Sequence, residues 1–171
     1  MSAFSREGPD ATLDAIAKDA GVGIGTLYRR FPTREALIEA AYRNELARLC
    51  DAAPRLRESM LPDAALREWM DRFLDYMRTK RGMADALRVV IASGADPFAQ
   101  SRARLLAAIT ELLDASAATG ATREDVQPAD VMASLSGISL AAGGRDQREQ
   151  AERLLDLLMD GLRSRPDRAR L

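Results

Sequence analysis

The feature that most constrains this chain is a set of apolar residues that recur at helical spacing along nearly its whole length. Leu13, Ile16, Ala17 and Ala20, for example, follow the i, i+3, i+4, i+7 order of one buried helix face. Val89–Ile91 is the best candidate for a strand, but it lies inside a helical pattern. The sequence therefore predicts an all-α protein, and the abundance of alanine and leucine favours the same fold.

Glycines and prolines divide this pattern into helices. Thr12 is predicted to cap a helix that ends at Gly21, and Pro32 is predicted to end a short helix from about Ile24 to Phe31. A third helix is predicted to be capped by Thr33 and to reach Leu49, after which Pro54 and Pro62 are predicted to bracket a loop. Five more helices are expected, separated by these breaks: Gly82, Gly94–Pro97, Gly120 with Thr122–Gln127, Pro128, and Gly143 with Gly144.

Residues 12–37 read TLDAIAKDAGVGIGTLYRRFPTREAL and have the order helix, glycine turn, short helix, helix. Two helices joined by a tight turn are the signature of a helix-turn-helix. The short second helix is predicted to have an apolar side with Val22, Leu27 and Phe31. From Gly21 through Arg34 there are three arginines and no acidic residue, although the net charge of the chain is −1. This local cationic patch suits contact with phosphates.

This stretch resembles the DNA-binding signature of the TetR family of transcriptional regulators. The shared elements occur in the same order and spacing, and they are Ile16-Ala17, Ala20-Gly21-Val22, Gly25-Thr26-Leu27-Tyr28, Phe31-Pro32 and Arg34-Glu35-Ala36-Leu37. The close match covers about the first quarter of the chain. The resemblance implies a helix-turn-helix DNA-binding domain at residues 1–49 and a helical ligand-binding and dimerisation domain at residues 50–171.

The resemblance also implies roles for single residues. The segment from Ile24 to Arg29 would lie in the major groove, with the Tyr28 hydroxyl on a phosphate and with Thr26 and Arg29 facing base edges or the nearby DNA backbone. Candidate DNA-binding residues are thus Thr12, Gly23, Ile24, Gly25, Thr26, Tyr28, Arg29, Thr33 and Arg34. Family members often carry Ser-Lys where Gly23-Ile24 stands here, so one cation is missing and Ile24 is free to touch a thymine methyl.

The family begins with a longer amphipathic helix than Met1–Glu7 can form. Three explanations stay open: a true start upstream, a shortened chain, or a degenerate head. The last of these supports an alternative function, namely a helical dimeric small-molecule-binding or interaction protein that no longer binds DNA.

Composition bears on the other function classes. The chain has no histidine and one cysteine, so Ser-His-Asp and Cys-His constellations are impossible, and we expect no enzyme, metal or cofactor. It contains no apolar run long enough to cross a bilayer, and the single Cys50 fits a reducing cytoplasm.

The body is expected to hold two further sites. A largely apolar effector would occupy a pocket among Trp69, Phe73, Tyr76, Met77, Met83, Leu87, Ile91, Leu105 and Ile109, although plain core packing explains each residue as well. A homodimer interface would include Leu135, Ile138, Ala142, Leu154, Leu155, Leu158 and Leu162, because the last helix is apolar over a wider arc than one buried stripe needs. The expected mechanism is a repressor that an effector releases from operator DNA.

Overall fold

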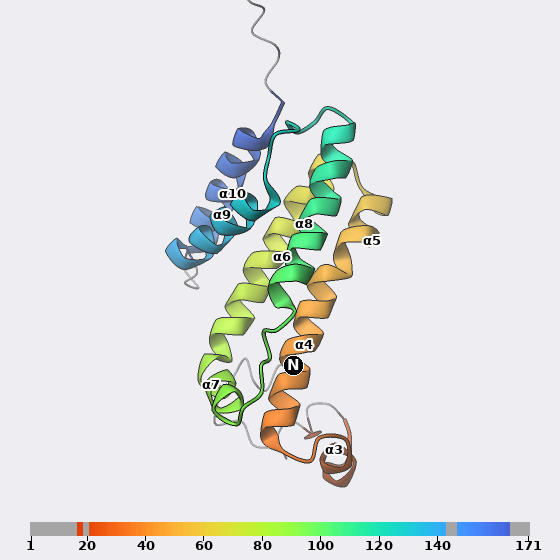
Figure 1. Cartoon of the computed structure of the whole chain (residues 1–171), viewed down its shortest axis with the longest axis vertical. Coiled ribbons are helices and arrows are strands. Elements are labelled where there is room, and N and C mark those ends of the chain that lie inside the picture. Colours follow the sequence, from red (N-terminus) through yellow and green to blue (C-terminus); the bar gives the residue numbers. More distant parts are fainter. Residues whose placement is uncertain (1–16, 19–20, 143–146, 165–171) are drawn as a thin grey trace, which may run out of the picture. The chain divides into compact units, whose positions relative to one another are not determined.

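The computed structural model describes residues 17–18, 21–142 and 147–164, and this part of the chain is all-α (Figure 1). Its helices are α3 (Ile24–Arg30), α4 (Arg34–Cys50), α5 (Ala52–Ser59), α6 (Pro62–Gly82), α7 (Ala84–Ala92), α8 (Ser101–Ala118), α9 (Pro128–Ala141) and α10 (Arg148–Leu162). The expected fold class is thus confirmed.

The chain forms two compact units. Unit 1 comprises Met1–Ala47 and Arg78–Ala99, and unit 2 comprises Arg48–Met77 and Gln100–Leu171. Two of the three divisions fall inside a helix, one within α4 and one near the end of α6, and the third lies just before α8. Each unit therefore takes its helices from segments that are distant in the sequence.

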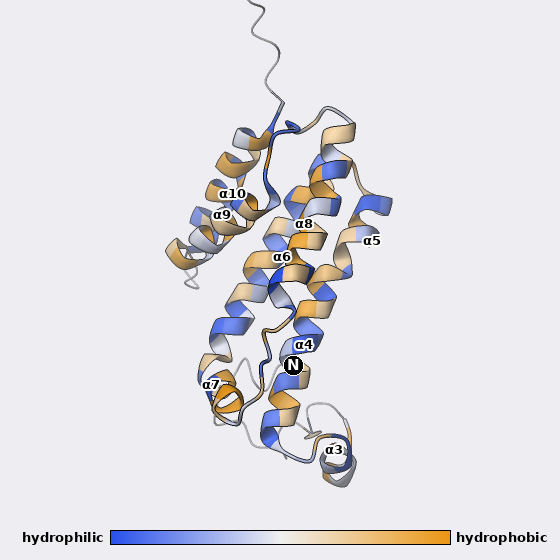
Figure 2. Cartoon of the chain, viewed as in Figure 1, coloured by the Kyte–Doolittle hydropathy of each residue, from blue (hydrophilic) through white to orange (hydrophobic). Residues whose placement is uncertain are grey.

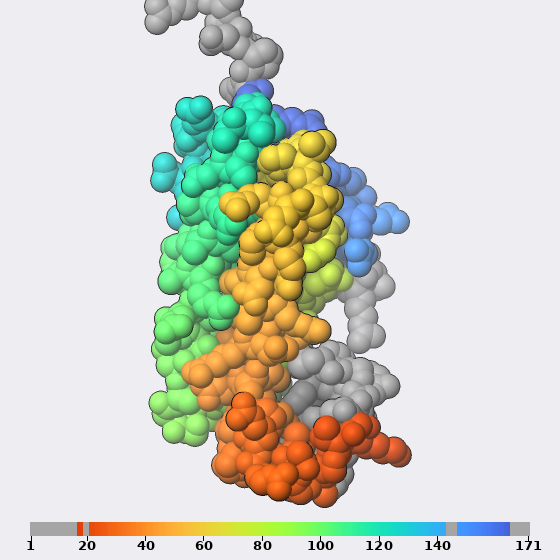
Figure 3. Space-filling model, turned by 90° about the vertical axis from the view of Figure 1, so that its right-hand side faces the viewer, coloured from red at the N-terminus to blue at the C-terminus, as the bar shows by residue number. Residues whose placement is uncertain are grey.

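Unit 2 is built around long helices that bury their apolar stripes. Trp69, Met70, Ile109, Leu135 and Leu155 are each fully buried. The helix α8 packs against α5 and α9, and α10 packs against α9; Figure 3 shows α5 and α8 side by side. Along these helices apolar and polar residues alternate in short patches, as amphipathic helices require (Figure 2).

The helix ends follow the glycines and prolines as predicted. Gly82 is the last residue of α6, and α7 begins after Met83. Gly94 and Gly120 have φ values of +90° and +73°, a region that residues with a Cβ rarely enter. Pro128 occupies the first turn of α9, where a missing N–H costs nothing. The predicted breaks at Gly143 and Gly144 lie outside the described residues.

The prediction of a loop between Pro54 and Pro62 was wrong. Residues Ala52–Ser59 form α5, and Pro54 is the third residue of this helix. The first turn of a helix has amide groups without intrahelical partners, so proline is tolerated there. Burial of Ala53 and Leu56 then holds this short helix in unit 2.

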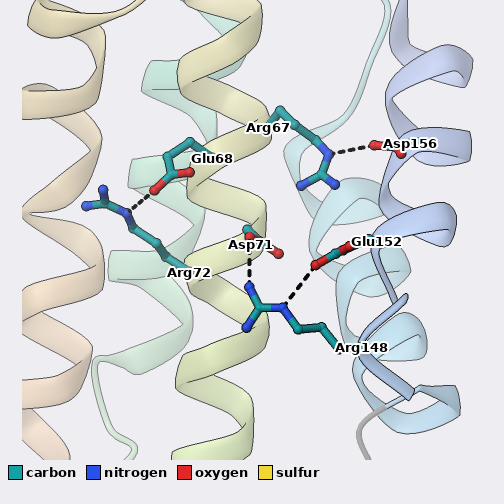
Figure 4. Close-up of polar contacts among 7 residues, drawn as sticks. All are labelled: Arg67, Glu68, Asp71, Arg72, Arg148, Glu152 and Asp156. Carbon is teal, nitrogen blue, oxygen red and sulfur yellow. Dashed lines mark hydrogen bonds and ion pairs between the residues drawn. The ribbon is translucent and has the colours of Figure 1, made fainter. Parts of the chain in front are cut away.

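Ion pairs cross between α6 and α10 in both directions (Figure 4). The Arg67 Nε atom of α6 donates to Asp156 Oδ1 of α10 at 3.0 Å. In the other direction Arg148 of α10 lies 3.9 Å from Asp71 of α6 and also bonds Glu152 of its own helix. Each pair joins a half-buried side chain of α6 to an exposed side chain of α10, so its contribution to the stability of the fold is small.

Candidate nucleic-acid interface

The turn before α3 is a Schellman motif centred on Gly21. The Gly21 N–H donates to the Lys18 carbonyl at 3.2 Å, and the Val22 N–H donates to the Ala17 carbonyl at 3.0 Å. The φ angle of Gly21 is +67°, so the predicted left-handed helix stop is confirmed. The turn satisfies the carbonyl groups of Ala17 and Lys18, and α3 begins three residues after Gly21.

The helix α3 has seven residues and buries a single side chain, Leu27, which is 8% exposed. Its other residues are exposed or half-buried, and Tyr28 is 50% exposed. A helix this short is not stable alone in water, so Leu27 anchors it to unit 1. Nearly the whole surface of this short helix is therefore exposed to solvent.

The chain then reverses through Phe31 and Pro32 into α4. The Phe31 N–H bonds the Leu27 carbonyl at 2.8 Å and closes the last turn of α3. At the start of α4, Thr33 Oγ1 accepts a hydrogen bond from the Ala36 N–H at 3.1 Å. The predicted threonine cap is therefore confirmed.

The exposed surface of α3 carries cations and no acid. Arg29 and Arg30 form its last turn and are exposed, and Arg34 begins α4 in a half-buried position. Two arginines beside an exposed tyrosine hydroxyl suit a polyanion, because each can bond phosphate oxygens without an intervening carboxylate.

Most of the sequence-predicted DNA-binding residues fall together on this turn and helix. Gly23, Gly25, Thr26, Tyr28, Arg29 and Thr33 are exposed, and Ile24 and Arg34 are half-buried. Thr12 lies outside the described residues. Val22 was expected on the apolar side of this helix, but it is 41% exposed, because it lies in the turn before α3 and is not part of the helix.

The residues predicted to line an effector pocket are divided between the two units. Trp69, Phe73, Tyr76, Leu105 and Ile109 are buried in unit 2, and Met77 of that unit is half-buried. The rings of Trp69 and Phe73 lie 5.9 Å apart, and Trp69 Nε1 donates to the Leu49 carbonyl at 2.9 Å. Met83, Leu87 and Ile91 belong to unit 1, where Ile91 is 48% exposed.

The residues predicted to form a dimer interface lie on α9 and α10. Leu135, Leu155, Ala142 and Leu162 are buried within the chain, and Ile138, Leu154 and Leu158 are half-buried. The most exposed apolar residues of these helices are Leu140 and Leu157, at 76% and 67%. Neither was among the residues predicted from the sequence to form the interface. Helical spacing puts them on the face opposite the buried stripe, which the residue types alone did not reveal.

Among the residues that the structure describes, no three metal-ligating side chains gather into a metal site. No helix of the described part is long and apolar enough to cross a membrane.

Two family models and several solved structures match this chain. The N-terminal model for bacterial regulatory proteins of the tetR family matches residues 1–41, and the model for the C-terminal domain of SbtR-like transcriptional regulators matches residues 61–164. No curated protein sequence gives a significant match.

The solved structures include two TetR regulators with clear sequence similarity. One, from Streptomyces coelicolor, is 58% identical with a TM-score of 0.93, and the match covers 96% of this chain and 94% of that protein. The other, from Mycobacterium vanbaalenii, is 33% identical with a TM-score of 0.76 over 95% of this chain and 89% of that protein. The TetR family regulator PfmR from Thermus thermophilus shares the fold at 19% identity, with a TM-score of 0.53 over 92% of this chain and 90% of that protein.

The helix-turn-helix geometry at Gly21 and the all-helical body define the class of this protein, a transcriptional regulator with a DNA-binding head. Both family models and the 58% identical structure then specify the group within that class. The chain belongs to the TetR family.

Proposed function

We propose that this chain is a homodimeric repressor that binds palindromic operator DNA in the cytoplasm and leaves it when a largely apolar small molecule binds its body. The observation that carries the DNA-binding part is α3 itself. This helix buries only Leu27 and exposes Thr26, Tyr28 and Arg29 on a surface without acidic residues. Repression and release are supported by membership of the TetR family, whose regulators bind operators as dimers.

In the proposed complex α3 lies in the major groove. The Tyr28 hydroxyl donates to a phosphate, and Thr26 and Arg29 reach base edges. Thr33 Oγ1 already accepts a bond from the Ala36 amide, and its hydroxyl hydrogen remains to be donated to a phosphate beside Arg34. In this proposal Thr12 also contacts a phosphate, and Ile24 contacts a thymine methyl group.

A mobility-shift titration with the DNA upstream of the gene tests this proposal. Arg29→Ala should weaken binding and lower the slope of log affinity against log salt by about one if the contact is to phosphate, and relax specificity at one base pair if it is to a base edge. Tyr28→Phe should weaken binding without unfolding the protein. Arg55→Ala removes an exposed arginine from α5 in unit 2 and should leave operator binding unchanged.

Gly25 offers a second, independent test. A Cβ added at this position meets no atom of the chain within 4 Å, and the residue lies inside α3. Gly25→Ala should therefore raise helix stability, because alanine has the higher helix propensity. If the backbone of α3 approaches DNA closely, the same variant lowers operator affinity while the fold is kept.

Failure of the well-folded dimer to bind any upstream DNA would contradict the proposal. It would favour the alternative, a helical dimeric interaction protein with a degenerate head.

The effector part is supported by the aromatic cluster of unit 2. Trp69 is the only tryptophan of the chain and is fully buried beside Phe73, so its fluorescence reports on this core. A titration with apolar compounds should change the Trp69 emission and release operator DNA at the same concentrations. Operator affinity that stays constant while Trp69 emission saturates would refute the sensor role.

We also propose that DNA binding belongs to residues 1–49 and ligand binding with dimerisation to residues 50–171. The two family models leave residues 42–60 between their matched ranges, and Leu49 lies inside that interval. Regulators of this family are in general not enzymes, and we assign no catalytic step to the chain.

A further inference from the structure

The exposed residues of α3 differ in the direction in which they point from the helix axis. Leu27 is the buried residue of this helix, so it marks the side that packs on the rest of unit 1. Successive residues of an α-helix are rotated by about 100°. Gly25 and Arg29, two positions before and after Leu27, therefore each point about 160° away from it. We call these two residues the outer ridge of α3, since they lie on the side opposite the packed one.

Tyr28 and Arg30 lie on the two flanks of the outer ridge. Both are neighbours of Arg29 in the sequence, so they point about 100° to either side of it. All three side chains are exposed. The last turn of α3 thus presents a tyrosine hydroxyl on one flank, an arginine on the ridge and a second arginine on the other flank.

Arg29 is the only side chain of the outer ridge, because Gly25 has none. A Cβ added at Gly25 meets no atom of the chain within 4 Å, so the space in front of this part of the ridge is open. Within the part of the chain that the structure describes, no ion pair occupies Arg29 or Arg30. Both guanidinium groups are therefore available to a partner outside the chain.

We propose that Tyr28, Arg29 and Arg30 contact, in that order, the backbone of one DNA strand, a guanine in the major groove and the backbone of the other strand. The inference rests on the proposed DNA binding and states which residue distinguishes one sequence from another. The major groove, about 12 Å wide, admits an α-helix whose outer ridge faces the base edges. Its two sides are the phosphates of opposite strands, so the two flanks of α3 meet different strands.

Guanine is the base that suits Arg29. A guanidinium group has N–H donors and no acceptor. In the major groove guanine presents two acceptors, O6 and N7, whereas adenine presents one acceptor beside a donor and thymine one acceptor beside a methyl group. A bidentate pair of Arg29 with a single base is therefore possible only with guanine. Thr26 discriminates less, because a hydroxyl bonds donors and acceptors alike.

Arg30 has a different role from its neighbour, and it was not among the DNA-binding residues predicted from the sequence. Phosphate oxygens are the same at every base pair, so a contact of Arg30 to the backbone fixes α3 in the groove without distinguishing sequences. Arg30 is thus a positioning residue, and Arg29 is the residue that determines specificity. The rotation between adjacent helical residues is what separates the two roles.

The adjacent arginines provide a matched pair of variants. Selection of binding sequences from random double-stranded DNA gives the motif of the wild-type chain. That motif should contain a guanine in each half-site whose replacement lowers affinity about tenfold or more, and Arg29→Ala should lose this preference. Arg30→Ala should keep the motif, weaken binding to every sequence by the same factor and lower the slope of log affinity against log salt by about one. Arg30→Lys keeps the charge and should restore the slope.

A change in the DNA tests the guanine contact with the wild-type chain. 7-Deazaguanine has carbon in place of N7 and keeps its Watson–Crick pairing. At the selected guanine it should lower the affinity of the wild-type chain about tenfold, because Arg29 loses one of its two acceptors. It should leave the affinity of Arg29→Ala unchanged.

These outcomes separate the inference from the proposed function. A well-folded wild-type chain that selects no sequence would refute the proposed DNA binding and, with it, this inference. A motif that Arg29→Ala leaves intact, or that Arg30→Ala changes at one position, would keep the proposed function and overturn the assigned roles. Equal affinity of the wild-type chain for guanine and 7-deazaguanine would likewise refute the bidentate contact.

Discussion

The ammonium nitrogen of Lys80 lies 4.4 Å from the centre of the Phe98 ring and 5.9 Å from that of Tyr42. The two rings meet edge to face, with centres 5.1 Å apart and an angle of 87° between their planes. Tyr42 comes from α4, Lys80 from the end of α6 and Phe98 from the segment before α8. This cluster therefore joins three segments of unit 1, the unit that also contains α3.

Burial lowers the pKa of Lys80, and the pH dependence of stability should show it. In the interval between the lowered folded pKa and the ordinary unfolded value, the unfolded chain binds more protons than the folded chain. The free energy of unfolding therefore rises with pH through this interval, and Lys80→Met should abolish that part of the rise. Urea unfolding at pH values from 7 to about 11 measures it. The exposed Lys18, changed to Met, is the control, and the same loss in both variants would contradict the prediction.

Trp69→Phe should lower the free energy of unfolding by about 1–3 kcal/mol, because the Leu49 carbonyl loses its buried indole donor. The carbonyl belongs to the last turn of α4, where intrahelical partners are lacking. Urea denaturation followed by circular dichroism measures the loss. Tyr28→Phe removes an exposed hydroxyl and should change stability by less than about 0.5 kcal/mol, so a similar loss in both variants would speak against the buried bond.

Thr33→Ala should destabilise the start of α4 by about 0.5–2 kcal/mol, since the Ala36 amide loses the oxygen that caps it. Hydrogen exchange of the Ala36 amide is the sharpest measurement, and its protection should fall. Thr33→Ser keeps a capping oxygen and should keep most of the protection. If Thr33→Ser failed to keep the protection of the Ala36 amide, the threonine methyl group and not the capping hydrogen bond would be responsible for it.

Neighbouring residues of α10 should differ strongly in their effect on stability. Leu155→Ala removes a fully buried side chain and should cost about 2–5 kcal/mol. Asp156→Asn breaks the bond to Arg67, but the Asp156 side chain is 67% exposed and the loss should stay below about 1 kcal/mol. Thermal unfolding of both variants at low and high salt checks the comparison. A larger effect of Asp156→Asn would mean that the ion pairs hold α10 in place.

The starts and ends of most helices were predictable because the interactions that cause them lie within a few residues. Gly21 ends a helix through its own backbone freedom, Thr33 caps α4 through a bond three residues away, and Pro128 begins α9. The short helix of the candidate DNA interface followed from the same signals. Pro54 was the exception, because proline breaks the interior of a helix but is tolerated in its first turn, and where α5 starts depends on tertiary packing.

Contacts between distant segments were not predictable from the sequence. The spacing of Leu140 and Leu157 indicates a helix face but not which face stays outside, because that depends on how α9 packs against α8 and α10. The meeting of Lys80 with Phe98, and of Arg67 with Asp156, likewise depends on packing across many intervening residues.

The sequence by itself thus determined the helical class, most helix ends and the cationic turn of the DNA-binding head, since short-range hydrogen bonding and backbone sterics decide these. Only the tertiary structure decided which apolar residues became core and which remained at the surface of α9 and α10. Burial is a property of packed helices, and each helix carries more apolar residues than one neighbour can cover.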